Sequence, residues 1–294
     1  IVLLGKKLAI SLKITNSQPM ELSTDCSISS GTDRVSTLWY DSKEPIDMAK
    51  QAQFQKLVNS INKPATYKED GVVLYNDDCL KILAAIPENS IDMIFADPPY
   101  NLSNGGFTVH AGRMVSVNKG EWDKSKGFKD DYDFHYQWLE ACRRVLKPNG
   151  TLWVSGTYHS IYQCGHAIQA LGYHILNDIS WFKPNASPNL SCRFFTASHE
   201  TLIWARKEKK AKHTFNYKAM KNGEWPEDKL KKPKFQMRSV WSISTPRPEE
   251  KKFGKHPTQK PEDLLKRVVL ASTKKGDIVL DPFTGHSTTG VMAL

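Results

Sequence analysis

The sequence contains few cysteines, and none of them lie at metal-binding spacing. The five cysteines are odd in number, far apart and include no Cys-x-x-Cys pair. This pattern argues against a zinc site and a disulfide framework, and it fits the reducing cytoplasm. No apolar run is long enough to span a bilayer, and Lys6 and Lys7 interrupt the apolar start, so it does not resemble a signal peptide. We therefore expect a cytoplasmic protein with no metal and no membrane partner.

The first 70 residues carry few signals of regular structure. Residues 11–37 are rich in Ser and Thr and have no sustained hydrophobic period, so we expect a flexible extension. Residues 45–61 have the spacing of a short amphipathic helix. The chain begins with Ile1 rather than Met and stops at Leu294 just as a helix starts, so we expect a fragment cut at both ends.

From Gly71 onward, predicted strands alternate with predicted helices. The strands are expected at 72–75, 91–97, 151–156, 174–182, 200–206 and 277–283, and the helices at 77–86, 134–146, 161–172 and 261–272. This alternation predicts an α/β fold with a doubly wound sheet. In such sheets, ligands bind beyond the carboxyl ends of the strands.

The positive charge is concentrated in one segment. The chain has a net charge of +10, and residues 206–255 hold 16 Lys or Arg against 6 Asp or Glu, a surplus equal to that of the whole chain. Trp225, Phe235 and Trp241 lie among these charges. We interpret the segment as an inserted basic module for a polyanionic partner, although a solvated surface explains most of these lysines individually.

The tetrapeptide DPPY follows the apolar run IDMIFA, so a buried strand delivers an acid, two prolines and a tyrosine at its end. Methyl transfer to an exocyclic amine requires that the amine be bent towards tetrahedral geometry. The Asp97 carboxylate and the Pro98 carbonyl can accept from its two N–H bonds, the Pro98–Pro99 pair fixes the carbonyl, and Tyr100 offers a face for an extruded base. The alternative is a plain strand-ending turn that contains an acid.

DPPY, then GKHPTQKPEDLLKRVVLAST, then DIVLDPFTG together resemble the β class of DNA amino-methyltransferases. These enzymes transfer a methyl group from S-adenosylmethionine to adenine N6 or cytosine N4, and the catalytic motif before the cofactor motifs is their circular permutation. SNGG, PNLSCRFFTASHETLIWARK and GKHPTQKP resemble more narrowly the second methyltransferase of Dpn-type restriction systems. That resemblance implies adenine in GATC and acceptance of single-stranded DNA.

The resemblance implies a Rossmann-like methyltransferase sheet with a cofactor site around DPFTGHSTTG. Ser287 is placed to cap a helix whose free amides hold a carboxylate, and Phe283 to cover the cofactor. In KHPTQKPEDLL, Thr258 and Lys260 are expected near the methionine carboxylate, while Pro at a helix start is the plain alternative. The cofactor-binding candidates are Asp78, Cys79, Asp97, Thr258, Lys260, Asp281, Phe283, Gly285, Ser287 and Thr288.

Two departures from the family pattern affect the cofactor site. The pattern D-P-F-x-G-S-G-T-T has His286 and Ser287 here in place of Ser and Gly, so we expect a narrower pocket and weaker cofactor binding. The acidic residue expected about 20 residues past Asp281 lies beyond Leu294. We therefore expect a truncated chain that lacks the strand between the one at 277–283 and the one at 72–75.

The DNA-binding candidates are the basic residues Arg193, Lys209, Lys210, Lys231, Lys232 and Arg238. Lysines contact phosphates, whereas the guanidinium groups of Arg193 and Arg238 can pair with guanine. The long loop 101–128, which contains GEWDK, is expected to act as a lid anchored by Trp122.

The sequence therefore predicts a site-specific DNA adenine N6-methyltransferase of a restriction-modification system, acting on double-stranded and also single-stranded DNA. A homodimer is compatible with this prediction. The alternatives are a cytosine N4-methyltransferase and a catalytically impaired DNA-binding remnant. The expected divisions are an extension at 1–70, a catalytic part at 71–184, a target-recognition insertion at 185–255 and an incomplete cofactor-binding part at 256–294.

Overall fold

The structure is a computed structural model, and it describes residues 2–4, 48–69, 71–103, 107–110, 113–116, 119–189, 192–223, 225, 228, 232, 235–251, 258–285 and 287–294. The α-helices are α1 (Met48–Ser60), α2 (Cys79–Ala85), α3 (Phe128–Val145), α4 (Ile161–Ala170), α5 (Tyr217–Asn222), α6 (Glu262–Ser272) and α7 (Thr288–Ala293). Two 3-10 turns are η1 (Glu121–Asp123) and η2 (Glu249–Lys251). The predicted helices within 45–61, 77–86, 134–146, 161–172 and 261–272 are therefore confirmed.

One mixed sheet runs through the described part of the chain in the order β10-β8-β9-β7-β4-β11-β1-β3-β2. Its strands are β1 (Val2–Leu4), β2 (Tyr67–Glu69), β3 (Val72–Leu74), β4 (Ile91–Ala96), β7 (Leu146–Gly156), β8 (His174–Phe182), β9 (His199–Arg206), β10 (Val240–Ser242) and β11 (Val279–Asp281). A separate hairpin pairs β5 (Phe107–His110) with β6 (Arg113–Ser116). The centre, β11-β4-β7, is parallel, whereas β9 is antiparallel to both neighbours.

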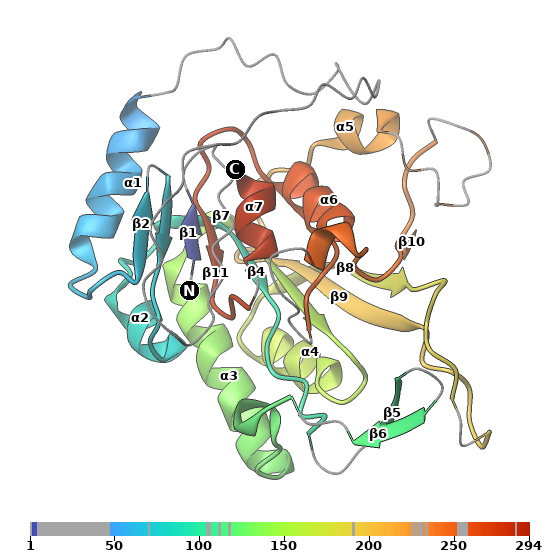
Figure 1. Cartoon of the computed structure of the whole chain (residues 1–294). Coiled ribbons are helices and arrows are strands. Elements are labelled where there is room, and N and C mark those ends of the chain that lie inside the picture. Colours follow the sequence, from blue (N-terminus) through green and yellow to red (C-terminus); the bar gives the residue numbers. More distant parts are fainter. Residues whose placement is uncertain are drawn as a thin grey trace, which may run out of the picture.

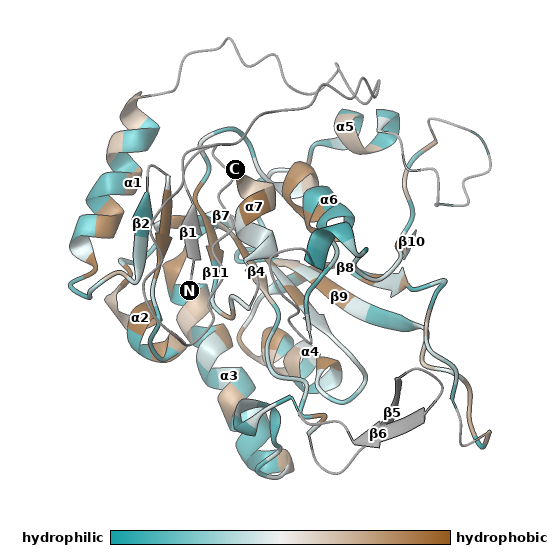
Figure 2. Cartoon of the chain, in the orientation of Figure 1, coloured by the Kyte–Doolittle hydropathy of each residue, from teal (hydrophilic) through white to brown (hydrophobic). Residues whose placement is uncertain are grey.

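Helices cover both faces of the sheet, which confirms the predicted α/β class (Figure 1). One apolar core contains side chains of α1, α2, α3 and α4, and a second contains side chains of α6. Strand β4 supplies both cores by alternation, because Ile94 and Ala96 enter the first and Met93 and Phe95 enter the second. In Figure 2 the helices carry hydrophilic as well as hydrophobic segments, as expected for elements with one solvent-facing side.

Strand β1 occupies a place that we expected to be empty. It lies between β11 and β3 and is antiparallel to both, with Val2 opposite Asp281 and Leu4 opposite Val72. The prediction of unpaired sheet edges between β11 and β3 is therefore wrong. Strand β2 also lies inside the segment 1–70, where the helix at 45–61 was the regular element that we expected.

The predicted insertion, 185–255, begins in the loop after β8 and contains two strands of the main sheet. Strand β9 lies between β7 and β8 in the main sheet, and β10 extends the sheet by pairing in parallel with β8. Both strands fall within 185–255, so this segment contributes to the core as well as to the surface. Within the described ranges, every helix is too short or too polar to cross a membrane.

Candidate active site

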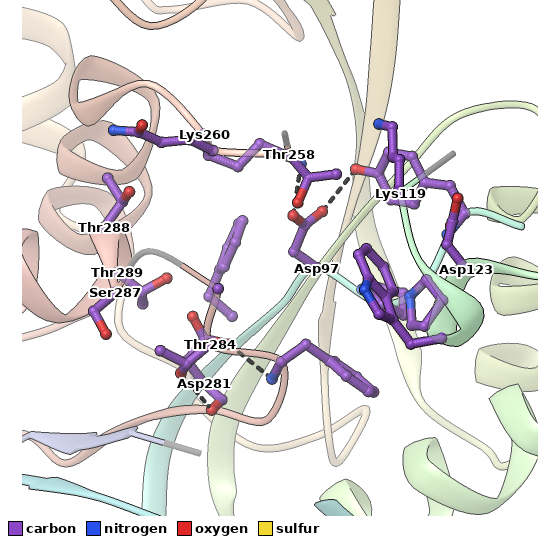
Figure 3. A pocket seen from close by; sticks show the side chains of 18 residues that line it. Asp97, Lys119, Asp123, Thr258, Lys260, Asp281, Thr284, Ser287, Thr288 and Thr289 are labelled. Carbon is purple, nitrogen blue, oxygen red and sulfur yellow. Dashed lines mark hydrogen bonds and ion pairs between the residues drawn. The ribbon is translucent and has the colours of Figure 1, made fainter. Parts of the chain in front are cut away.

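A cavity of about 350 Å³ lies at the carboxyl edge of the central parallel strands. The strands β4 and β11 are parallel neighbours, so the residues that follow them emerge at the same edge. Figure 3 shows Asp97 at the centre of this site, with Thr258 and Lys119 on one side and Asp281, Thr284 and Ser287 on the other. The lining residues are Phe95, Asp97, Pro98, Pro99, Tyr100, Lys119, Trp122, Asp123, Thr258, Gln259, Lys260, Asp281, Phe283, Thr284, Gly285, Ser287, Thr288 and Thr289.

The cavity brings together all four residues of DPPY and eight of the ten predicted cofactor residues. Asp78 and Cys79 are absent from its described lining. Asp78 instead caps α2, because its Oδ1 accepts hydrogen bonds from the Leu80 and Lys81 amides at 2.8 and 3.3 Å. Cys79 packs partly against the core beside α3, and burial raises the pKa of its thiol to about 11. The helix-start explanation thus accounts for the contacts of Asp78 in this structure.

The Asp97 carboxylate is held by three side chains, two of which come from distant parts of the chain. Its Oδ1 accepts from the Tyr100 hydroxyl at 2.7 Å and from the Ser155 hydroxyl at 3.0 Å. Its Oδ2 accepts from the Lys260 ammonium at 2.6 Å. Since Lys260 is only 6% exposed, the ion pair is shielded from water and fixes the direction of the carboxylate.

A second buried acid, Glu200, completes the network. Its Oε2 lies 2.9 Å from the Tyr100 hydroxyl and 3.7 Å from Lys260 Nζ, while its Oε1 accepts from Lys183 Nζ at 2.8 Å. Burial alone raises the pKa of Glu200, but the ammonium groups of Lys260 and Lys183 outweigh it and lower that pKa below its ordinary value. The pKa of Lys260 is raised, because Asp97 and Glu200 outweigh its burial. Glu200 and Lys260 are therefore both charged at neutral pH.

The Tyr100 side chain is more confined than the sequence suggested. Its residue exposure is 6%, and burial together with the carboxylates of Asp97 and Glu200 raises the pKa of its phenol well above the ordinary value. The Lys260 ammonium lies 5.0 Å from the centre of its ring. One face of the Tyr100 ring is thus engaged by a cation, and its hydroxyl is fixed by the network.

A carboxylate that the sequence did not single out holds the loop after DPPY. Asp123 is 1% exposed, and its two oxygens accept from the backbone amides of Tyr100, Asn101 and Leu102 at 2.9 to 3.1 Å. It also accepts from the Ser103 hydroxyl at 2.9 Å. Asp123 therefore anchors the loop, a role that we had expected of Trp122.

Trp122 lines the cavity instead and is 50% exposed. Its indole packs over Gly120, where an added Cβ would lie 2.8 Å from Trp122 Nε1. Gly120 has φ of +124°, a conformation that residues with side chains rarely adopt. Glycine at this position thus permits the indole to stand at the wall of the cavity.

On the opposite wall, the Asp281 carboxyl is 4% exposed and accepts from the Phe283 amide at 3.0 Å. Burial raises its pKa to about 6. Phe283 packs edge-on against Trp138, with ring centres 5.2 Å apart. Ser287 adopts a left-handed backbone conformation with φ of 56°. Glycine, which the family pattern has at this position, adopts that conformation without a steric penalty. His286 lies outside the described residues.

The comparisons with known proteins now identify the family. A family model described as DNA methylase matches residues 91–294. The chain belongs to this DNA methylase family. It is 51% identical over 228 residues to the type II methyltransferase M2.LlaDCHI of Lactococcus lactis subsp. cremoris and to M2.DpnII of Streptococcus pneumoniae, covering 77% of this chain and 82% of each relative. It is 48% identical over 218 residues to M2.MboI of Moraxella bovis, covering 74% and 77%.

The solved structures agree on the fold of this methylase. The cytosine-N4-specific PvuII DNA methyltransferase superposes with a TM-score of 0.56 at 20% identity, covering 75% of this chain and 77% of that one. A complex of M1.HpyAVI with its SAM cofactor matches at 26% identity with a TM-score of 0.49, covering 74% and 86%. The predicted methyltransferase fold and the predicted family are confirmed.

The cavity of the methylase fits S-adenosylmethionine, the methyl donor that the sequence resemblance implies. It contains polar donors for a carboxylate, in Thr258, Lys260, Ser287 and Thr288, beside the aromatic ring of Phe283. Its volume of about 350 Å³ lies in the range of small-molecule sites. The described residues contain no group of three or more His, Cys, Asp or Glu arranged to hold a metal.

Two of the predicted DNA-binding residues lie far from this cavity. Strand β9 begins beside the cavity with Glu200 and ends at Arg206, which pairs with Thr151 at the start of the regular β7 ladder. Lys209 and Lys210 follow Arg206 and are therefore at the opposite edge of the sheet, about 20 Å of strand away. Their assignment as DNA-binding residues stays a prediction, and any such contact would lie away from the cavity.

The other basic candidates have different positions. Arg193 lies on the loop between β8 and β9, and Arg238 precedes the edge strand β10; both side chains are exposed, as is Lys232. Lys231 lies outside the described residues. The tryptophans of the basic segment are structural, since the buried guanidinium of Arg267 lies between the rings of Trp225 and Trp241 at 4.3 and 4.9 Å and pairs with Asp228 at 2.9 Å.

The site residues that sequence reasoning missed are Lys119, Asp123, Ser155, Lys183, Glu200, Gln259, Thr284 and Thr289. Ser155 and Glu200 fall inside predicted strands, so nothing marked them as polar groups at a sheet edge. Asp123 carried one weak signal, an acid in GEWDK within a long loop beside DPPY. Thr284 and Thr289 lie within DPFTGHSTTG and were passed over for their neighbours.

Proposed function

We propose that this methylase transfers the methyl group of S-adenosylmethionine to N6 of adenine in DNA, within GATC, as the modification component of a type II restriction system. The observation that carries this proposal is the position of Asp97, whose carboxylate faces the same cavity as Phe283 and Gly285. Tyr100 and Lys260 fix that carboxylate in place. Since DNA is the substrate, we propose that the enzyme acts in the cytoplasm.

Asp97 has one acceptor site left for the amine of the target base. An ionised carboxylate offers about four lone-pair sites. The bonds from Tyr100 and Ser155 occupy Oδ1, and the bond from Lys260 occupies one site of Oδ2. The second site of Oδ2 accepts one N–H of the adenine amine, and the Pro98 carbonyl accepts the other. These two bonds direct the nitrogen lone pair away from Asp97, towards the donor side of the cavity.

The bound cofactor supplies an electrophilic methyl group on a cationic sulfur. Thr258 and Lys260 would hold its carboxylate, and Phe283 and Gly285 would line the cavity around it. Asp97 acts by positioning the amine and by hydrogen bonding. After the N–C bond has formed, Asp97 takes the amine proton and passes it to water. Lys260 fixes the direction of the Asp97 carboxylate, so one acceptor site faces the amine.

The target base enters between two aromatic side chains of different exposure. The ring of Tyr100 lines the cavity, with Lys260 over one face. Trp122 is the more exposed aromatic residue of the wall, and its indole is available for stacking. Arg193 and Arg238 contact base edges and Lys232 contacts phosphate, while single-stranded DNA reaches the cavity without the cost of unpairing.

The deciding experiment is methylation of a GATC duplex with labelled S-adenosylmethionine, followed by mass spectrometry of the nucleosides. We expect N6-methyladenine, whereas N4-methylcytosine would establish the alternative substrate. Asp97→Ala should abolish transfer while duplex binding stays within about threefold, because DNA affinity comes mainly from phosphate contacts. Retained turnover in this variant would refute the role of Asp97.

The impaired-remnant alternative has one observation in its favour. Ser287 is held at φ of 56°, and a side-chain residue in this region costs roughly 1 kcal/mol relative to glycine. We therefore propose that the cofactor is bound more weakly than in relatives with glycine there. Salt-sensitive DNA binding without any cross-linking to labelled S-adenosylmethionine would support the remnant.

A further inference from the structure

The loop between β8 and β9 exposes two adjacent aromatic side chains. Phe194 is 68% exposed and Phe195 is 98% exposed. The loop, residues 183–198 with the sequence KPNASPNLSCRFFTAS, contains Lys183 and Arg193 and no Asp or Glu. Exposed aromatic rings without nearby acids are suited to the bases of a polyanion, since each ring loses solvent contact when it stacks and the cations favour the approach.

The tip of this loop has a defined shape. The Asn189 side-chain amide donates to the Phe194 carbonyl at 2.8 Å, and the Asn189 backbone amide donates to the Thr196 hydroxyl at 3.3 Å. Cys192, at φ of 51°, turns the backbone between them. The two phenylalanines are thus presented by a braced turn rather than by a chain end.

The base of the loop is fixed to the active site. The Lys183 amide donates to the Ser198 carbonyl at 2.7 Å, and the Lys183 ammonium pairs with Glu200, which lies 2.9 Å from the Tyr100 hydroxyl. Asn185 and Thr245 brace the same base with reciprocal hydrogen bonds of 3.0 and 3.1 Å. Phe195 lies five positions before Glu200, so its backbone lies within about 18 Å of the Glu200 backbone. This reach is comparable to a few base-pair steps.

We propose that Phe194 and Phe195 form a wedge that enters duplex DNA beside the target base and stacks in the space that the extruded base leaves. The inference rests on the proposed DNA methylation. It adds a device that opens the duplex, supplied by a loop whose base is part of the catalytic network. Side-chain wedges of this kind offset the cost of unstacking a base.

The test compares the double variant Phe194→Ala/Phe195→Ala with Phe128→Ala, which removes an equally large side chain that is 78% exposed at the start of α3. The substrates are a GATC duplex and the corresponding single strand, with 2-aminopurine at the target adenine in a parallel binding assay. The double variant should lose about tenfold or more in kcat/KM on the duplex and the fluorescence rise of the extruded base. Its melting temperature and activity on the single strand should match those of Phe128→Ala.

The outcomes separate the wedge from the proposed function. An unchanged fluorescence rise and unchanged duplex activity in the double variant would overturn the wedge while leaving methylation intact. An equal loss on both substrates would show that the rings stack on single-stranded bases, which also overturns it. If the wild-type protein gives no methylated adenine on either substrate, the proposed function fails, and the fluorescence assay alone still decides whether the rings open the duplex.

Discussion

Asp123→Asn is the change that best isolates the anchoring of the catalytic loop. In the wild type, the two Asp123 oxygens accept hydrogen bonds from three consecutive backbone amides and one hydroxyl, so a single side chain fixes the start of the loop. Asparagine keeps the shape, and its remaining oxygen still accepts from Tyr100 and Asn101. Its NH₂ group faces the Leu102 amide, where two donors then oppose each other.

The expected cost follows from that lost acceptor. A partly buried amide without a partner costs about 1–3 kcal/mol, and exchange of a charged acceptor for a neutral one weakens the other bonds. We expect the free energy of unfolding to fall by about 2–3 kcal/mol. We also expect kcat to fall at least tenfold, because a loosened DPPY loop no longer holds the amine, while cofactor affinity changes little.

The assay pairs urea unfolding with single-turnover methylation and calorimetric cofactor binding. The matched control is Glu121→Gln, an acid-to-amide change two positions away in the same 3-10 turn. The Glu121 side chain is 87% exposed and pairs with Lys124 on the surface. That control should remain within about 0.5 kcal/mol of the wild type. Wild-type kcat in Asp123→Asn would refute the anchoring role.

Three further changes test the walls and core of the site. Trp122→Ala should raise KM for DNA about tenfold with unchanged cofactor affinity, and Trp122→Phe should restore most of it; equal effects of both would argue against stacking. Ser287→Gly should stabilise the fold by roughly 1 kcal/mol and tighten cofactor binding, as measured by calorimetry, because it relieves the left-handed backbone at this residue. Burial lowers the pKa of His135 to about 4, so the folded protein holds this side chain in its neutral form. The free energy of unfolding should therefore fall by about 3 kcal/mol as the pH drops from 6.5 to 4. His135→Leu should remove this pH dependence, as measured by urea titration.

The parts of the site that the sequence predicted share one feature. Asp97 and Asp281 each follow a short apolar run, and such runs become parallel neighbours in an α/β sheet, so their ends meet at one edge. Thr258 and Lys260 lie just before helix α6, and both line the cavity at this edge of the sheet. The apolar runs and the geometry of a parallel sheet were therefore sufficient to predict that these residues meet.

The parts that could not be predicted depend on strand direction. Hydrophobic alternation looks the same whether a strand runs parallel or antiparallel, and β9 is antiparallel to β7 and β8. This direction places Glu200, at the start of β9, beside Tyr100 and sends Lys209 and Lys210 to the far edge. Asp78 illustrates a different limit, since an acid at a helix start reads the same whether it caps the helix or binds a ligand.

The Asp97 carboxylate depends on side chains outside DPPY for its position. The hydroxyl of Tyr100 lies within hydrogen-bond distance of Asp97, Ser155 and Glu200, yet it carries one proton and donates to one carboxylate at a time. Ser155 adds one more proton for two contacts. The two hydroxyl groups therefore supply fewer protons than the carboxylates of Asp97 and Glu200 can accept. The ammonium groups of Lys260 and Lys183 compensate the negative charge of these carboxylates. An arriving amine donates one N–H to the remaining acceptor site of Asp97, so the network is preorganised to accept the target base.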